Sequence, residues 1–97
     1  MSVGIIQEFD GFEPENYRAV SQEMNFPADW PDGLVAHAAG TVEGGMRIVD
    51  IWESRDQFDR FSEETIQPAI QATAGEAASQ APPPRITEFE VLAFESR

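Results

Sequence analysis

Cysteine and lysine are both missing from this chain of 97 residues, and histidine occurs only once, as His37. Without cysteine there is no disulfide, no thiolate nucleophile and no cysteine-ligated zinc or iron–sulfur centre. The lone histidine and the scattered carboxylates show none of the spacings that metal ligands adopt, and no glycine-rich phosphate loop is present. We therefore expect neither a metal nor a cofactor.

Positive charge is also scarce. Six arginines stand against 18 acidic residues, which gives a formal net charge of −12. Binding a nucleic-acid backbone or an anionic lipid surface depends on clustered lysine and arginine. We therefore expect no nucleic acid and no membrane among the partners of this protein.

Long apolar runs are absent as well. No segment approaches the roughly 18 apolar residues that a membrane span requires, and the first residues lack the basic start of a signal peptide. A cytoplasmic protein is the expectation. Hydrophobic residues still make up 41% of the chain, which is typical of a folded protein. With no linker-like stretch, residues 1–97 are predicted to form a single domain.

Strand and helix signals alternate along the chain. Residues 3–10 favour a central strand, because both of its faces carry apolar side chains. The segment from Glu13 opens with a proline and spaces its apolar residues on one face, which indicates a helix. The proline-rich stretch 25–33 indicates a loop. Its Phe26 and Trp30 either plug the end of the core or, in the case of Trp30, form one wall of a pocket mouth.

Two strand-like runs flank Glu43-Gly44-Gly45, which is a strong hairpin signal because glycine supplies the positive φ of tight turns. A turn at Glu43-Gly44 places His37 opposite Asp50, and a turn at Gly44-Gly45 places it opposite Trp52. In both registers His37 shares a face with Asp50 and Trp52. The other face is predicted to carry Leu34, Ala36, Ala38, Arg47, Val49 and Ile51.

A second helix is predicted after this hairpin. Ser54 is its expected N-cap, with Gln57 as the capping-box partner three residues later. Gln67-Pro68 is expected to end or kink the helix, and a further short helical piece is expected to follow before a proline-rich loop. Residues 86–94 form the last predicted strand.

The predicted order is therefore βαββαβ, an α+β fold of the ferredoxin-like type with an antiparallel sheet and both helices on one side. The strands carry apolar side chains on both faces, so the face without helices needs cover. A second copy of the chain is the simplest cover, and a symmetric homodimer is the expected form.

The passage IVDIWESRDQFDRF, which ends at Phe61, resembles the strand-to-helix passage of the dimeric α+β barrel superfamily, especially its antibiotic biosynthesis monooxygenase-like branch. The resemblance implies a dimeric α+β barrel and a cofactor-independent monooxygenase-like activity on an aromatic or polyketide-like substrate. Such enzymes use an Asn on an early strand and a Trp on the second helix, and this sequence has Gln7 and Phe61 there. The same scaffold also hosts isomerases, haem-degrading proteins and proteins with no assigned role.

The remaining candidate site is His37 with its neighbours on the same face. An Asp beside a His can fix the tautomer of the imidazole, and a Trp face can stack on an aromatic ligand. We predict His37 and Asp50 as the catalytic residues, and Trp52, Trp30 and Phe61 as substrate-binding residues. The alternative is a non-catalytic homodimer, a ligand-binding or structural accessory domain, in which the His–Asp pair only holds two strands together.

Overall fold

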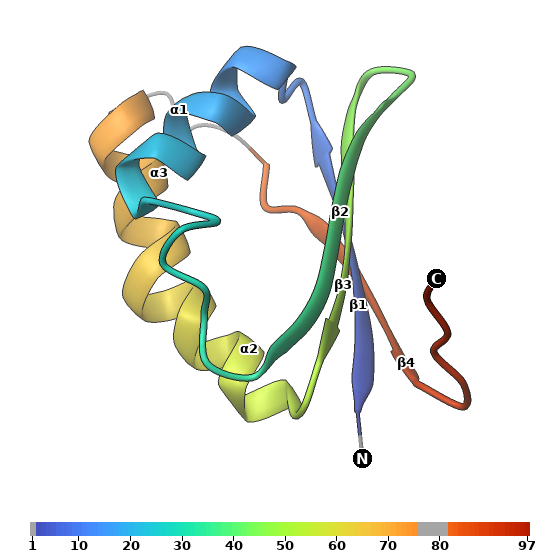
Figure 1. The fold of residues 1–97 in the computed structure, drawn as a ribbon. Coiled ribbons are helices and arrows are strands. Elements are labelled where there is room, and N and C mark those ends of the chain that lie inside the picture. Colours follow the sequence, from blue (N-terminus) through green and yellow to red (C-terminus); the bar gives the residue numbers. More distant parts are fainter. Residues whose placement is uncertain (1, 76–81) are drawn as a thin grey trace.

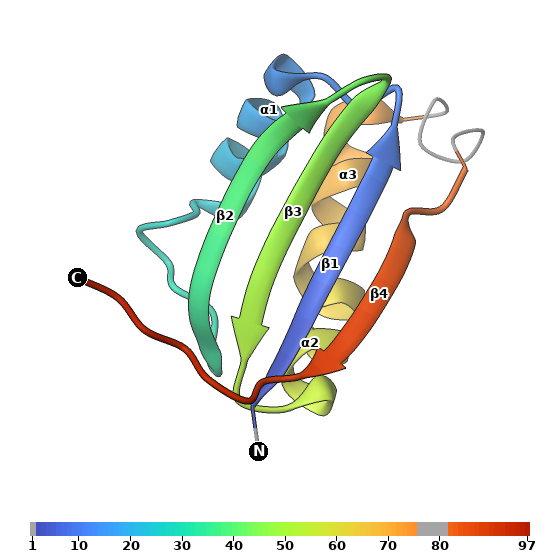
Figure 2. The ribbon, with the colours of Figure 1, turned by 90° about the vertical axis from the view of Figure 1, so that its right-hand side faces the viewer.

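The computed structural model describes residues 2–75 and 82–97 of the chain. Its elements, in order, are β1 (Val3–Asp10), α1 (Pro14–Met24), β2 (Leu34–Val42), β3 (Gly45–Trp52), α2 (Arg55–Phe61), the π-helical segment η1 (Ser62–Ile66), α3 (Gln67–Ala74) and β4 (Arg85–Glu90). The strands form one antiparallel sheet in the order β2-β3-β1-β4. All helices lie against one face of this sheet (Figures 1 and 2). The predicted ferredoxin-like α+β fold is confirmed.

The β2–β3 hairpin turns at Glu43-Gly44, the first of the two predicted registers. His37 pairs with Asp50 across the two strands. Gly44 has a φ of 83°, which glycine adopts without steric cost. Because paired residues point to the same side of a sheet, the side chains of His37 and Asp50 lie next to each other on the helix-covered face.

The predicted face of Leu34 is wrong. The β2–β3 pairing is irregular between Leu34 and Ala36, and an extra residue at such a bulge reverses the alternation of side chains before it. Leu34 pairs with Trp52 and is buried beside it, whereas Val35 is exposed. The bulge thus supplies the core with a side chain that strict alternation would have left on the other face.

The second helix continues through Gln67-Pro68, where an end or a kink was predicted. Its regular pitch is interrupted earlier, by the π-helical segment Ser62–Ile66, and Pro68 lies in the first turn of α3. In a regular helix the proline ring clashes with the carbonyl one turn back, and a wider turn in front of it relieves that clash. The predicted short helical piece ends at Ala74, and its residues 76–79 lie outside the described residues.

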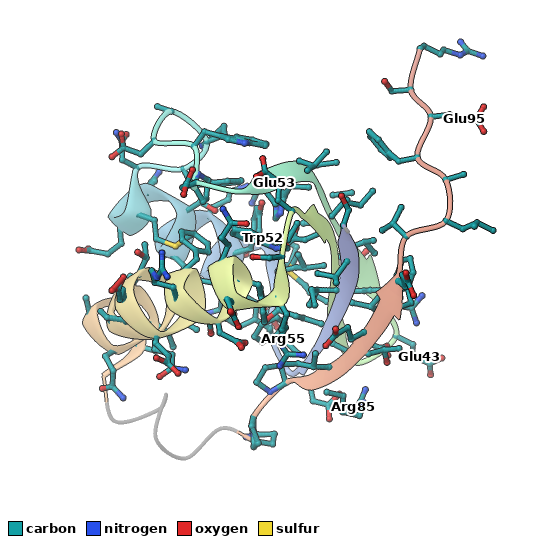
Figure 3. The ribbon with its side chains drawn as sticks, turned by 90° about the horizontal axis from the view of Figure 1, so that it is seen from below. Glu43, Trp52, Glu53, Arg55, Arg85 and Glu95 are labelled. Atoms are coloured by element: carbon teal, nitrogen blue, oxygen red, sulfur yellow. The ribbon has the colours of Figure 1, made fainter. Side chains whose placement is uncertain are left out.

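The core lies between the sheet and the helices, with Trp52 at its centre (Figure 3). Trp52 and Ile5 have no exposed surface, and Phe58 packs edge to face on the Trp52 ring, with the ring centroids 5.9 Å apart. The predicted N-cap is confirmed, because the Ser54 hydroxyl accepts a hydrogen bond from the backbone nitrogen of Gln57 at 3.2 Å. This cap turns the chain sharply from β3 into α2 and so brings Phe58 over Trp52.

The last strand is shorter than predicted. β4 ends at Glu90 rather than at Phe94. Among the described residues its one neighbouring strand is β1, which begins at Val3, and beyond that pair a single backbone hydrogen bond, from the nitrogen of Val91 to the carbonyl oxygen of Ser2 at 3.1 Å, continues the register. Residues 92–97 then leave the sheet on the side away from the helices (Figures 1 and 3). The side chain of Leu92 is fully exposed there, and Phe94 is about half exposed. The tail therefore presents apolar side chains to water in the isolated chain.

The sheet face opposite the helices is mostly apolar. The pairing register places seven apolar side chains on it: Ile6, Ala36, Ala38, Val42, Val49, Ile51 and Phe89. Phe89 lies directly over Gly4, where a Cβ atom would come within 2.1 Å of the ring. Its ring remains 44% exposed, and an ion pair between Arg47 and Glu8 at 3.1 Å shares this face. Among the described residues of the isolated chain, only the tail after β4 passes along this side, at the lower ends of the strands, and most of the face is left open (Figure 2).

Candidate functional site

Four hydrogen-bonded side chains run from α1 across the hairpin on its helix-covered face. The Tyr17 hydroxyl lies 2.7 Å from Nε2 of His37, and Nδ1 of His37 lies 2.6 Å from Oδ1 of Asp50. Nε1 of Trp52 donates a hydrogen bond to Oδ2 of the same carboxylate at 3.3 Å. Three elements, α1, β2 and β3, are thereby joined through polar side chains at the edge of an apolar core.

Asp50 determines which nitrogen of His37 carries the hydrogen. Asp50 is only 5% exposed, and as a carboxylate it can only accept hydrogen bonds. Nδ1 of His37 therefore donates to Asp50, and Nε2 is left as the acceptor for the Tyr17 hydroxyl. Nε2 of the neutral imidazole is then a basic nitrogen that can accept the proton of Tyr17 when Tyr17 takes a proton from a ligand.

Tyr17 is the member of this chain that sequence reasoning missed. It lies on the apolar face of α1 with Val20, which is buried, and a tyrosine in that position is expected to be a core residue. The only available signal was its hydroxyl, because a buried phenol usually finds a hydrogen-bond partner. That the partner is His37 depends on how α1 packs on the sheet.

Burial raises the pKa of the Tyr17 phenol above its ordinary value of 10.0. The nearby Ser21 hydroxyl opposes this rise, and the Asp50 carboxylate adds to it. Both burial and a neighbouring negative charge disfavour the phenolate. Tyr17 is therefore protonated at neutral pH and acts as a hydrogen-bond donor toward Nε2 of His37.

Tyr17 is the only tyrosine of the chain, so the ultraviolet absorbance of tyrosinate reports on it alone. In a pH titration we expect the folded protein to develop this absorbance at higher pH than the protein unfolded in urea. Asp50→Asn removes the negative charge and should lower the pKa of Tyr17. Circular dichroism at each pH shows whether the chain is still folded. A folded Tyr17 that ionises no later than the unfolded one would contradict the described geometry.

An apolar cavity of about 60 Å³ lies behind this polar chain. Tyr17 and His37 border it on one side, and Gln7 and Phe61 contribute to the rest of its wall. Ligand pockets usually measure at least about 300 Å³. The inner cavity has room for dioxygen or a few water molecules but not for a ring system.

An outer cleft of about 470 Å³ lies on the solvent side of the same two residues. Tyr17 and His37 form part of its lining, together with Phe26 and Trp30 from the loop 25–33. The Phe26 and Trp30 rings stack with their centroids 5.6 Å apart, and Trp30 is 50% exposed. The outer cleft therefore has the size of a ligand pocket and an aromatic wall, and it reaches the polar chain.

A second cleft of about 310 Å³ lies beside the same loop and is lined on its other side by α2 and η1. Phe61 borders this second cleft and the inner cavity, but not the outer cleft. Phe26 borders all three spaces, and its ring meets the His37 ring edge to face at 4.8 Å. The side chain of Phe26 therefore lies between the inner cavity and the two clefts.

The structure brings some of the predicted site residues together and separates others. His37 and Asp50 are in direct contact. Trp52 lies behind Asp50 with no exposed surface, so its ring is not open to a ligand and its contribution is the hydrogen bond to the carboxylate. Trp30 lines the outer cleft and Phe61 the inner cavity, so these two residues border different spaces around the polar chain.

No group of three or more His, Asp or Glu side chains in residues 2–75 and 82–97 is close enough to hold a metal ion. No helix in this part of the chain has the length and apolar character needed to cross a membrane.

Several solved structures share this fold at low sequence identity. SnoaB, a cofactor-independent oxygenase from Streptomyces nogalater, is 14% identical with a TM-score of 0.64, over 96% of this chain and 95% of that chain. A proposed antibiotic biosynthesis monooxygenase from Chloroflexus aurantiacus is 14% identical with a TM-score of 0.65, over 99% and 98%. A dimeric ferredoxin-like protein of unknown function from Thermobifida fusca is 15% identical with a TM-score of 0.63, over 94% and 92%. No protein-family model and no curated protein matches the sequence.

These similarities confirm the fold that the strand-to-helix passage predicted, since each match covers nearly the whole of this chain and nearly the whole of the other protein. At this level of identity they show the fold alone.

Proposed function

We propose that the protein binds a small aromatic or polyketide-like molecule in the outer cleft and removes a proton from it, as a cofactor-independent monooxygenase-like enzyme. The observation that carries this proposal is the hydrogen-bonded chain of Tyr17, His37 and Asp50, which ends at a cleft of about 470 Å³. A histidine oriented by a carboxylate is a suitable general base near neutral pH. The stacked rings of Phe26 and Trp30 suit a flat ligand.

The proposed first step is a proton transfer. The ligand gives the proton of a phenol or enol to the oxygen of Tyr17, while the proton of Tyr17 passes to Nε2 of His37 over the 2.7 Å hydrogen bond. His37 becomes an imidazolium, which the Asp50 carboxylate stabilises at 2.6 Å. The ligand is left as an electron-rich anion with negative charge shared onto a ring carbon.

Dioxygen is the co-reactant of the second step. The ring carbon of the anion forms a bond to dioxygen, and the resulting peroxide takes the proton back from His37. The hydroperoxide carbon then loses its remaining hydrogen as water leaves, which gives a carbonyl. The carbon is oxidised, one oxygen atom enters the product and the other departs as water, so no external reductant is needed. SnoaB, which shares the fold, is a cofactor-independent oxygenase, and this supports the reaction class.

Oxygen uptake tests the proposal. With a dihydroxyanthrone as probe substrate, a metal chelator present and no added cofactor, we expect the protein to consume one dioxygen for each quinone formed, faster than buffer alone. If the rate of oxygen uptake equals that of buffer alone for a range of hydroxylated tricyclic probes, the proposal is wrong.

A homodimer is proposed as the working form. The open sheet face is apolar around Ile51 and Phe89, and the exposed side chains of Leu92 and Phe94 belong to the tail on that same side of the sheet (Figure 1). A contiguous apolar face of this kind is typical of a subunit interface. The apolar face also supports the second candidate function, a non-catalytic homodimeric accessory domain. Dimerisation through this face would not require a ligand in the outer cleft.

Ile51→Lys is expected to produce monomers. A lysine in the middle of an apolar interface would leave a charge without water, which should weaken dimerisation on the order of a hundredfold. Analytical ultracentrifugation over a range of concentrations measures this change. Thr41→Lys is the matched control, since Thr41 is exposed near the hairpin turn, on the other side of the sheet. A wild-type monomer, or an Ile51→Lys dimer as stable as the wild type, would be incompatible with the proposed interface.

A further inference from the structure

Among the described residues, some of the six arginines form ion pairs with carboxylates, and others do not. Arg47, Arg55 and Arg85 form ion pairs with carboxylates. Arg18 forms no ion pair with any other described residue, and it lines the outer cleft. One guanidinium is therefore available at the mouth of the cleft that reaches His37.

Among the residues that the structure describes, no carboxylate lines the outer cleft. Its polar side chains besides Tyr17 and His37 are those of Arg18, Ser21 and Gln22. The second cleft also includes an arginine, Arg60, but three carboxylates line it as well, those of Asp29, Asp32 and Glu64. In a chain with a net charge of −12, a cleft that has one guanidinium and no acid favours a negatively charged group.

Ser21 supplies an independent observation. Its hydroxyl oxygen is buried. It lies near enough to the Tyr17 hydroxyl to lower the pKa of Tyr17, but it makes no hydrogen bond of acceptable geometry with any described residue. Buried polar groups are nearly always paired with protein or with an ordered molecule. Ser21 borders both the inner cavity and the outer cleft, and it lies one helical turn from Arg18 on α1. A polar atom of a bound molecule could form a hydrogen bond with this hydroxyl.

We propose that the ligand of the outer cleft carries a carboxylate besides its phenol or enol, and that Arg18 binds this carboxylate. The inference rests on the proposed function and adds the charge of the substrate to it. A guanidinium offers two parallel donors that match a carboxylate. With the carboxylate at Arg18 and another oxygen of the ligand at Ser21, the ring lies between Phe26 and α1 with its acidic oxygen toward Tyr17.

Three probes separate the charge from the ring: a dihydroxyanthrone, its carboxylic acid, and the methyl ester of that acid. Affinities are measured without oxygen by the quenching of tryptophan fluorescence. We expect the acid to bind about five- to tenfold more tightly than the ester, which is the range of a partly exposed charge-assisted contact. Raising the salt concentration should reduce this preference. Arg18→Gln should bring the affinity of the acid down to that of the ester.

Arg60→Gln is the control, because it removes the same charge from the second cleft and should keep the preference for the acid. If Arg18→Gln keeps the preference, or if Arg60→Gln abolishes it, the assignment of Arg18 is overturned, while the proposed function stands as long as the probes bind. If no probe binds to the wild-type protein, the proposed function fails first. Arg18 is exposed, so thermal melting of Arg18→Gln should match the wild type and confirm that the variant is folded.

Discussion

His37→Gln is expected to lower the rate of hydroxyanthrone oxidation by about 10²- to 10⁴-fold, which is the usual contribution of a positioned general base. Glutamine can still form hydrogen bonds with Tyr17 and Asp50, but it cannot take up a proton. The His37 side chain is only 17% exposed and its ring packs against that of Phe26, but glutamine is similar in size, so the replacement should remove little packing. Oxygen uptake and thermal melting of the same preparation measure the two effects separately.

The matched control for this variant is Thr41→Gln, on the same face of the same strand but outside the cleft lining. It should keep both the activity and the melting temperature. If His37→Gln instead lowers the melting temperature strongly and leaves ligand binding and turnover unchanged, the His–Asp pair is structural. The non-catalytic homodimer would then be the better description of the protein.

Trp52→Ala is expected to reduce the free energy of unfolding by about 3–5 kcal/mol, the range for removing a large aromatic side chain from a core. Trp52 has no exposed surface, and its ring contacts those of Phe58 and Phe61, with centroid distances of 5.9 Å and 5.5 Å. Domains of this size have total stabilities of about 5–15 kcal/mol, so the variant should be close to unfolding. Urea denaturation followed by circular dichroism measures the loss.

Two further variants separate the roles of the tryptophans. Trp52→Phe keeps most of the ring volume but removes the Nε1 donor to Asp50. It should therefore cost less stability than Trp52→Ala, and the folded variant should still be less active than the wild type. Trp30→Ala removes a half-exposed ring and should cost less than about 1 kcal/mol while weakening ligand binding. A tolerated Trp52→Ala with lost ligand affinity would mean that the Trp52 ring contacts the ligand after all.

Local patterns predicted the parts of this fold that depend on neighbours in the chain. The hairpin at Glu43-Gly44 and the cap at Ser54 follow from residues within a few positions of each other. The misassigned features depend on tertiary neighbours. Leu34 changed faces through a bulge, and β4 ended opposite Val3, the first residue of its antiparallel partner β1. The helix continued past Pro68 because a π-helical turn precedes it. A hydrophobic period of two or 3.6 encodes none of these features.

For the candidate site, the sequence predicted which strand residues share a face but not how deeply each is buried or which helix residue contacts them. Strand alternation fixes which residues share a face, so the sequence alone places His37 on one face with Asp50 and Trp52. It does not say how deeply each residue lies, and Trp52 proved to be fully buried. Tyr17 was missed because the rotation of α1 against the sheet is set by packing, and only that packing brings its hydroxyl to His37.

A ligand in the outer cleft is expected to act on the imidazole of His37 through Tyr17, which hydrogen-bonds to Nε2. The chain has only this histidine, so its proton and nitrogen magnetic resonance signals are unambiguous. The test is an oxygen-free titration with the dihydroxyanthrone carboxylic acid while these signals are recorded. The proposed site predicts a saturable change of the Nε2 signal with the same affinity as the quenching of tryptophan fluorescence. An imidazole spectrum that stays unchanged while the fluorescence shows the protein saturated would contradict it.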